Sequence, residues 1–203
     1  MCIRDSNADV TDDVSLDRAF DQLAKRWPQI DFVVHAIAFS DKDELTGRFL
    51  QTSRENFKNY ISAYSFIEVA RRAHPLMVKN GGSLITLTYQ GSNKVTPFYN
   101  VMGVAKAALE STTRYLASDL GPEGIRVNAI SPGPMKTLAG AAIGGARKTY
   151  KFTDQNAPLQ SNATLEAVGG TAVYLIGDAG ACTTGEIIHL SLIHISEPTR
   201  PYS

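Results

Sequence analysis

Apolar residues recur along the chain with two different periods. Short runs rich in β-branched residues are typical of strands buried in a parallel sheet, and four are present, at 31–39, 83–88, 125–131 and 186–190. Longer segments repeat their apolar positions about every 3.6 residues, which is the period of an α-helix. Four of these are predicted, at 12–25, 52–77, 99–120 and 164–176. Because strand and helix signals alternate, we expect an α/β fold with a parallel sheet and right-handed crossovers.

The segment 99–120 carries the clearest helical stripe. Its apolar face is predicted to hold Met102, Ala105, Leu109, Leu116 and Leu120. The segment 52–77 opens with Thr52 and Glu55 at the spacing of a capping box, in which each side chain bonds to the other residue's backbone N–H. We therefore expect that helix to begin at Thr52.

Composition and charge narrow the class of protein. The 203 residues are 43% hydrophobic and 20% charged, as in one globular domain with a substantial core. Lysines and arginines balance aspartates and glutamates, which argues against nucleic acid or an anionic membrane as partner. No apolar run approaches the roughly 20 residues of a membrane span, and no secretory signal is recognisable. Cys2 and Cys182 have no metal-ligand spacing, so we expect no metal site and a reducing cytoplasm.

The candidate chemistry centres on a tyrosine and a lysine at the start of the predicted helix 99–120. Tyr99 and Lys106 are seven positions apart, so their side chains project within about 20° of each other on an α-helix. A phenol donor and an ammonium group can then face one cleft. Tyr89 follows the predicted strand 83–88, at the carboxyl end where open α/β sheets bind ligands. The alternative is that both tyrosines only cap the core with their hydroxyls in water.

The pattern Y-x6-K with a second tyrosine ten residues upstream, in YQGSNKVTPFYNVMGVAKAALE (89–110), resembles the enoyl-acyl-carrier-protein reductases of bacterial fatty-acid synthesis. These are divergent short-chain dehydrogenases/reductases, whose ordinary members have Y-x3-K; here Gly103 occupies that lysine position. The segments VHAIAFSDK (34–42) and GPEGIRVNAISPGPMKTLA (121–139) support the resemblance, which extends from about Asn7 to Leu190.

The resemblance implies a Rossmann-like doubly wound parallel sheet and an enzyme that reduces the trans-2 double bond of enoyl-acyl-carrier-protein thioesters. It implies NADH as cofactor, with NADPH as the alternative, and a homotetramer. Tyr99 would donate a hydrogen bond to the enolate, Lys106 would bind the nicotinamide ribose, and Tyr89 would be a second active-site tyrosine.

The resemblance also assigns residues that contact the cofactor and the substrate. Asp9 would bind the adenine amino group, Val10 would lie beside the adenine ring, and the backbone of Ile37 would approach the cofactor. The nicotinamide half would lie along Met135, Lys136, Thr137, Leu138 and Ala139. Ser40 would contact substrate, and 140–150 would form a mobile lid.

Each of these assignments has a structural alternative. Asp9 could belong to a helix N-cap region, Ile37 to the core and Ser40 to a solvated loop. The segment 132–139 could be a rigid strand-to-helix turn whether or not a ligand binds. His35 is interpreted as a strand histidine rather than a ligand or a catalytic base.

Both ends depart from the pattern. We expect 7–190 to form a partial Rossmann-like domain without its first βαβ unit, and 1–6 and 191–203 to be non-native ends. The family's glycine-rich pyrophosphate turn would lie upstream of Asn7, so we expect the polypeptide as written to bind cofactor weakly or not at all. Another short-chain dehydrogenase, such as a 3-oxoacyl reductase, and a non-catalytic fragment are the alternative functions.

Overall fold

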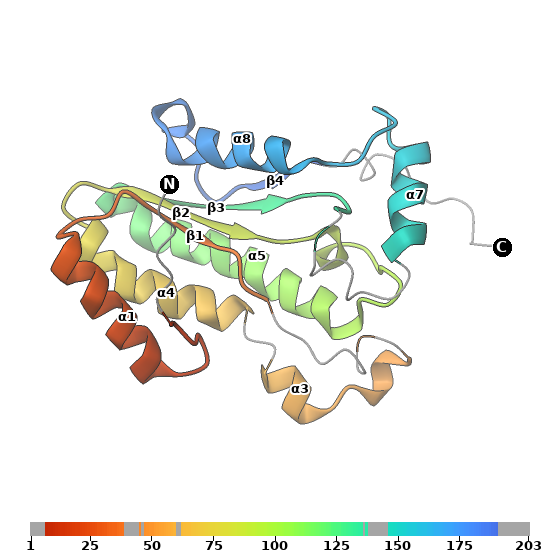
Figure 1. The fold of residues 1–203 in the computed structure, drawn as a ribbon, viewed down its shortest axis with the longest axis horizontal. Coiled ribbons are helices and arrows are strands. Elements are labelled where there is room, and N and C mark those ends of the chain that lie inside the picture. The colour runs from red at the N-terminus through yellow and green to blue at the C-terminus, as the bar shows by residue number, and fades with distance from the viewer. Residues whose placement is uncertain are drawn as a thin grey trace.

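The computed structural model describes residues 7–38, 45, 47–59, 62–135, 137 and 146–190. Four strands form one sheet in the order β1-β2-β3-β4, and every neighbouring pair is parallel (Figure 1). The strands are β1 (Phe32–His35), β2 (Gly82–Leu87), β3 (Ile125–Ser131) and β4 (Ile187–His189). All four predicted strands are therefore confirmed: β3 has the predicted bounds, and the bounds of the other three differ by one to four residues.

The helices cover both faces of the sheet. They are α1 (Asp13–Arg26), α3 (Arg54–Asn59), α4 (Ser62–Met77), α5 (Asn100–Leu120), α7 (Ala146–Asn156) and α8 (Leu165–Ile176). Figure 1 shows α4 and α5 on one face and α8 on the other, with α1 packed against α4. Short 3-10 turns complete the described elements: η1 (Phe49–Gln51), η2 (Gln90–Ser92), η3 (Gly121–Glu123) and η4 (Asp178–Gly180). The doubly wound α/β arrangement is confirmed.

Three local predictions differ from the structure. The single helix predicted at 52–77 is described as two elements, α3 and α4, and residues 60–61 lie outside the described part of the chain. The capping box at Thr52 is wrong: Thr52 donates to the carbonyl of Phe49, and Ser53 caps α3 by accepting a bond from the N–H of Asn56 at 3.0 Å. Helix α7 has no counterpart among the predicted elements, because its sequence is polar, with Tyr150 and Phe152 as its only large apolar residues.

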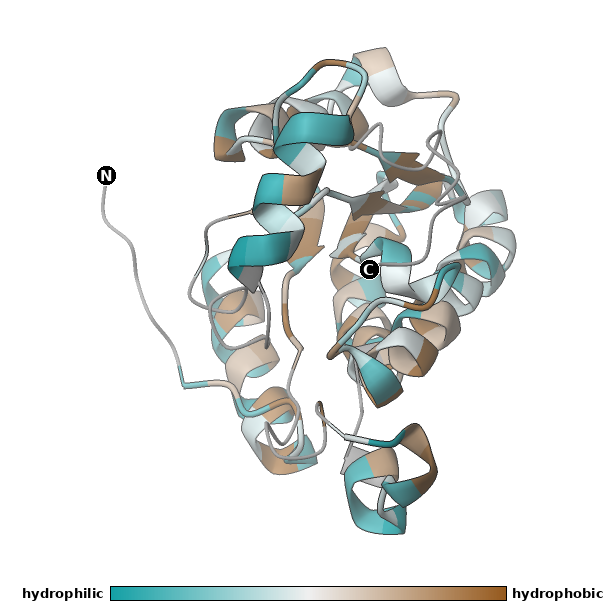
Figure 2. Ribbon diagram, turned by 90° about the vertical axis from the view of Figure 1, so that its right-hand side faces the viewer, coloured by the Kyte–Doolittle hydropathy of each residue, from teal (hydrophilic) through white to brown (hydrophobic). Residues whose placement is uncertain are grey.

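The main core lies between the sheet and the face covered by α4 and α5. Phe66, Met77, Leu109 and Ile125 have no exposed surface there. The predicted stripe of α5 is confirmed, since four of its five residues are buried and Leu116 is partly buried against the same core. A smaller apolar cluster under α8 packs Ile85, Ile130 and Leu175 against the opposite face. Figure 2 shows much brown on the strands, and the two central strands β2 and β3 are the mostly buried ones.

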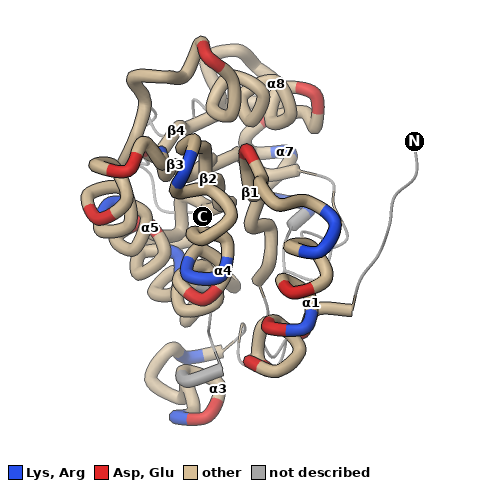
Figure 3. The backbone as a smooth tube through the Cα atoms, turned by 90° about the vertical axis from the view of Figure 1, so that its left-hand side faces the viewer, with Lys and Arg blue, Asp and Glu red and all other residues tan. Residues whose placement is uncertain are grey.

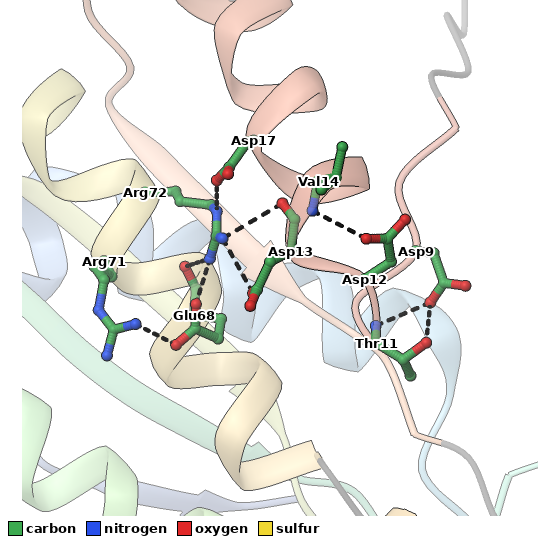
Figure 4. A network of polar contacts seen from close by, with 9 residues as sticks. All are labelled: Asp9, Thr11, Asp12, Asp13, Val14, Asp17, Glu68, Arg71 and Arg72. Atoms are coloured by element: carbon green, nitrogen blue, oxygen red, sulfur yellow. Dashed lines mark hydrogen bonds and ion pairs between the residues drawn. The ribbon is translucent and has the colours of Figure 1, made fainter.

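An ion-pair network joins α1 to α4 (Figure 4). Arg72 contacts Glu68 on its own helix, and it bonds to Asp17 at 2.7 Å and Asp13 at 3.2 Å on α1. Burial alone would lower the pKa of Arg72, but its hydrogen bonds with Glu68 and Asp17 raise that pKa above the ordinary value. Figure 3 shows charges of both signs interspersed over α1 and α4. Arg72 is the cation that connects the two helices (Figure 4).

No described helix is long and apolar enough to cross a membrane, and the described residues contain no group of three or more metal-binding side chains.

The Arg72→Leu substitution should lower the free energy of unfolding by about 2–4 kcal/mol, because it leaves the carboxylate of Glu68 buried without its main partner. Urea denaturation followed by circular dichroism measures the change. Arg71→Leu is the matched control, since Arg71 also pairs with Glu68 but its side chain is 63% exposed, and it should cost less than about 1 kcal/mol. Equal losses in the two variants would contradict this account.

Candidate active site

The carboxyl ends of the parallel strands place several of the predicted residues at one edge of the sheet. His35 pairs with Thr86 and Leu87 pairs with Ile130 in the ladder, so the segments that follow β1, β2 and β3 leave the sheet at the same edge. Tyr89 lies two residues beyond β2, and α5 begins directly after Tyr99. The segment of Met135 follows β3. Ligand sites in open α/β sheets form at this edge.

Tyr99 is the residue that precedes the first turn of α5, and its side chain is buried. Its ring centre lies 5.0 Å from the ring centre of Tyr89, with the planes tilted by 58°. A tilted pair at this separation is a favourable aromatic contact. The alternative in which both tyrosines end in bulk water is therefore wrong for Tyr99, which is 5% exposed.

Two glycines determine how tightly Tyr99 is enclosed. A Cβ on Gly91 would lie 2.4 Å from Cδ1 of Tyr99, and a Cβ on Gly103 would lie 2.6 Å from the carbonyl oxygen of Gly91. Position 103 is where ordinary short-chain dehydrogenases carry their lysine, and here no side chain fits there without moving the backbone. Close packing of η2 on α5 thus excludes the Y-x3-K pattern and leaves Lys106 as the lysine of this helix.

The backbone beside Tyr99 is strained. Phe98 has φ of 60° and Asn100 has φ of 24°, so both neighbours of Tyr99 lie in a region that side-chain-bearing residues rarely adopt. Such strain is found where the surrounding structure holds a functional side chain in position.

Lys106 is 6% exposed, and its Nζ donates to the carbonyl oxygen of Leu87 at 2.7 Å. Burial lowers the pKa of Lys106 to about 8, and the nearby Glu110 carboxylate acts against that shift. The ammonium therefore carries its proton at neutral pH. The Leu87 carbonyl is the one hydrogen-bond acceptor of Nζ among the described residues, so two of its three donors remain for a ligand.

The sequence patterns did not indicate three further polar residues of the site, which are Thr88, Ser92 and Glu110. Glu110 is buried on α5 and accepts hydrogen bonds from the hydroxyls of Thr88 at 2.8 Å and Ser92 at 2.5 Å. The signal that could have found it is its position four residues after Lys106, which places both side chains on one face of α5.

His35 is buried and fully hydrogen-bonded, as expected for a strand histidine. Its Nδ1 lies 3.0 Å from Oγ1 of Thr86, and its Nε2 lies 2.9 Å from Oγ of Ser65 on α4. Burial, together with the positive charge of Lys106, lowers the pKa of His35 to about 4. The imidazole is therefore neutral at physiological pH and serves to link β1 to β2 and α4.

The structure describes some of the remaining predicted site residues but not all of them. Asp9 is exposed and its hydrogen bonds are local: it accepts from the backbone N–H and the hydroxyl of Thr11, which lower its pKa. The helix N-cap is Asp12, whose carboxylate accepts from the N–H of Val14. Val10 is half-buried, and Ile37 is 43% exposed, so the core alternative for Ile37 is wrong.

Met135 and Thr137 are half-buried beyond β3, and the N–H of Thr137 bonds to the carbonyl of Met135 at 3.0 Å in a tight turn. Four predicted site residues lie outside the described part of the chain: Ser40, Lys136, Leu138 and Ala139. Most of the predicted lid does too, although its last residues open α7.

The edge of the sheet suits a polar cofactor. The hydroxyl of Ser131, the last residue of β3, is buried without a hydrogen-bond partner among the described residues. A buried orphan hydroxyl costs about 1–3 kcal/mol, and a polar ligand group can remove that cost. The two remaining donors of Lys106 likewise match the hydroxyl acceptors of a ribose.

Comparison with known proteins decides the family. The family model described as enoyl-(acyl carrier protein) reductase matches residues 4–191. This chain belongs to the enoyl-acyl-carrier-protein reductase family. A member from Rhizobium meliloti, enoyl-[acyl-carrier-protein] reductase [NADH] 1, is 57% identical over 91% of this chain and 68% of its own length. A Rickettsia conorii reductase is 53% identical over 90% of this chain and 70% of its own length.

Solved structures of the family have the same fold. The reductase of Anaplasma phagocytophilum, determined in complex with NAD, matches with a TM-score of 0.89 and 50% identity over 93% of this chain and 73% of its own. The reductase of Candidatus Liberibacter asiaticus matches with a TM-score of 0.91 and 45% identity over 96% of this chain and 76% of its own. The resemblance predicted from the tyrosine and lysine spacing is thus confirmed, and this reductase chain spans about two thirds to three quarters of the length of these relatives.

The Gly91→Ala substitution should displace the ring of Tyr99, because the added methyl would lie 2.4 Å from that ring. We expect a loss of about 1–3 kcal/mol in the free energy of unfolding, as for an overpacked core. Gly169→Ala on α8 is the control: a Cβ there meets nothing within 4 Å, and alanine favours a helix over glycine by about 1 kcal/mol. Chemical denaturation of both variants measures the difference, and an unaltered Gly91→Ala protein would refute the close contact.

The stability of the protein should fall as the pH drops from 6.5 to 4, because the unfolded chain protonates His35 near 6.5 whereas the folded chain does so near 4. His35→Gln should remove about 2 kcal/mol of the stability lost between about pH 7.5 and pH 5. His74→Gln, at a half-buried histidine on α4, is the control and should leave most of that loss in place. Identical pH dependence in wild type and His35→Gln would show that His35 does not carry it.

Proposed function

We propose that this chain reduces the trans-2 double bond of enoyl thioesters carried on acyl carrier protein, as an oxidoreductase of fatty-acid synthesis. NADH is the proposed cofactor, as in the names of the Rhizobium and Rickettsia relatives, and it supplies the hydride when bound. The observation that carries the proposal is the enclosed Tyr99 in contact with Tyr89, with Lys106 two turns further along the same helix, in a chain that the family model matches over residues 4–191.

Tyr99 is proposed as the residue that stabilises the substrate when its β-carbon is reduced. Negative charge then develops on the thioester oxygen, and a fixed hydroxyl aimed at that oxygen stabilises the enolate. The ring cannot turn away, because Gly91 and the ring of Tyr89 pack against it. Such preorganisation makes a hydrogen bond worth more in the transition state than in the bound substrate.

Lys106 is proposed to orient the cofactor. Its carbonyl contact with Leu87 fixes the side chain, and the charge that it carries at neutral pH makes its remaining N–H groups strong donors. The same charge favours the ionised form of a nearby phenol, which helps Tyr99 to share or release its proton. Tyr89 is proposed to shape the pocket against Tyr99, and Asp9, Val10, Ile37 and the segment 135–139 to contact the cofactor.

Three further parts of the proposal rest on the family resemblance. The acyl-carrier-protein-bound substrate is the partner that the family's name implies. The homotetramer and the cytoplasmic location are proposed by analogy, and the molecular mass in solution, measured by light scattering, tests the first of these. The boundaries of the reductase domain at 7 and 190 stay a prediction.

Tyr99→Phe should lower kcat for NADH-dependent reduction of a crotonyl thioester by about 10²-fold or more, because it removes one donor to the enolate. The assay uses NADH up to millimolar concentration. It is run on the chain itself and on a chimera in which the chain replaces the matching 68% of the Rhizobium relative. Tyr115→Phe is the control, since Tyr115 lies on α5 but is 77% exposed, and it should retain full turnover.

The same assay separates the alternatives. Turnover of acetoacetyl but not crotonyl thioester would replace the proposal with a 3-oxoacyl reductase. Absence of turnover with both substrates in both proteins would favour a non-catalytic chain. Undiminished turnover in Tyr99→Phe would remove Tyr99 from the role of donor.

A further inference from the structure

Glu110 is a buried carboxylate for which the proposed chemistry has no use. It lies on α5, one turn after Lys106, and is 5% exposed. Burial of a carboxylate costs several kcal/mol unless hydrogen bonds compensate for the lost water. Here the compensation comes from two hydroxyls on one segment of chain, those of Thr88 and Ser92, which both donate to Oε1.

These two hydroxyls bracket the first active-site tyrosine. Thr88 directly precedes Tyr89, and Ser92 ends the 3-10 turn η2 that follows it. Lys106 adds a third tie one residue earlier, by donating to the carbonyl of Leu87. The segment from Leu87 to Ser92 is thus attached to α5 at both of its ends by neighbouring turns of the same helix.

The anchored turn also contacts the second tyrosine. Gly91 lies within η2, between the two ends that Glu110 holds, and its Cα abuts the ring of Tyr99 so closely that no Cβ fits. The ring of Tyr89 lies 5.0 Å from that of Tyr99. A shift of η2 by a few tenths of an ångström would therefore move both rings.

Glu110 is also the nearest counter-charge of Lys106. Its carboxylate opposes the effect of burial on the pKa of Lys106, whereas His35, whose pKa the charge of Lys106 helps to lower, is neutral above about pH 4 and supplies no counter-charge. Among the described residues, Glu110 is the one carboxylate whose charge raises the pKa of Lys106, so its removal would leave the ammonium without that compensating anion.

We propose that Glu110 is a positioning residue of the reductase site, which anchors the Thr88–Ser92 turn to α5 so that both tyrosines are held in register, and which places a counter-charge beside Lys106. The effect on turnover rests on the proposed enoyl reduction, whereas the anchor and the counter-charge are measurable without it.

The counter-charge is tested in the full chain by Glu110→Gln, which keeps an oxygen acceptor for the two hydroxyls and removes the charge. The titration of Lys106 is followed by NMR of 13C-labelled lysine, with the signal assigned through Lys106→Arg. We expect the midpoint to fall from about 8 by about half a unit or more. Glu68→Gln is the matched control, a second buried glutamate that pairs with arginines on α4, and should leave the Lys106 midpoint unchanged.

The anchor is tested by Thr88→Val with Ser92→Ala, which keeps the charge and removes the two donors. We expect new ring signals for Tyr89 and Tyr99 in the NMR spectrum, a Lys106 midpoint close to that of wild type, and about a tenfold lower kcat with little change in KM. Thr113→Val is the control for loss of a buried hydroxyl on α5, because Thr113 bonds within its own helix, and it should leave both rings unchanged.

An unchanged titration midpoint of Lys106 in Glu110→Gln would refute the role of Glu110 as counter-charge. Unchanged tyrosine signals in the Thr88 and Ser92 double variant would refute its role as anchor of the turn. If wild type reduces no enoyl thioester, the proposed function fails, yet the two NMR measurements still decide whether Glu110 holds the turn and the charge.

Discussion

Two opposite charges buried one turn apart on α5 set the geometry on which the site depends. Lys106 and Glu110 are both almost without solvent contact, and each can be buried only because its hydrogen bonds are made inside the protein. Those bonds all reach the same short connection, from Leu87 to Ser92. The hydrogen bonds that compensate for burying the two charges therefore also fix the position of the connection that carries Tyr89.

The glycine contacts depend on that position. Gly91 and Gly103 allow the connection to lie directly on α5, and the ring of Tyr99 fills the remaining space beside them. The approach is close enough to exclude any side chain at position 103. The lysine of the site must then lie one turn further along the helix, so the longer Y-x6-K spacing follows from packing at this contact.

The sheet places these features where a ligand can reach them. All strands are parallel, so the connections after β1, β2 and β3 leave at one edge. His35, at the end of β1, links that strand to β2 and α4 through two hydrogen bonds while remaining neutral. On the outer side, Arg72 holds α1 against α4, at a distance from the chemistry but in the same layer of helices.

Most of the fold was predictable because its signals are local. The β-branched runs gave four strands, and the stripe from Met102 to Leu120 gave α5, since burial on one face imposes a period that the residues must show. Helix α7 was not predicted because a polar, mostly exposed helix need not repeat apolar residues at the helical period. Thr52 and Ser53 are adjacent hydroxyl residues that could each cap a helix. Only the backbone geometry decides that Ser53 caps α3.

The sequence by itself determined the family, the α/β class and the candidate residues Tyr89, Tyr99 and Lys106, because these follow from residue types, their spacing and the alternation of strand and helix patterns along the chain. The tertiary structure alone decided that Tyr99 is enclosed by Gly91, that Lys106 is buried with a lowered pKa, and that Glu110 joins α5 to the turn after β2. These features arise between segments that are separated along the chain, so their distances and their solvent exclusion exist only once the sheet and α5 have packed together.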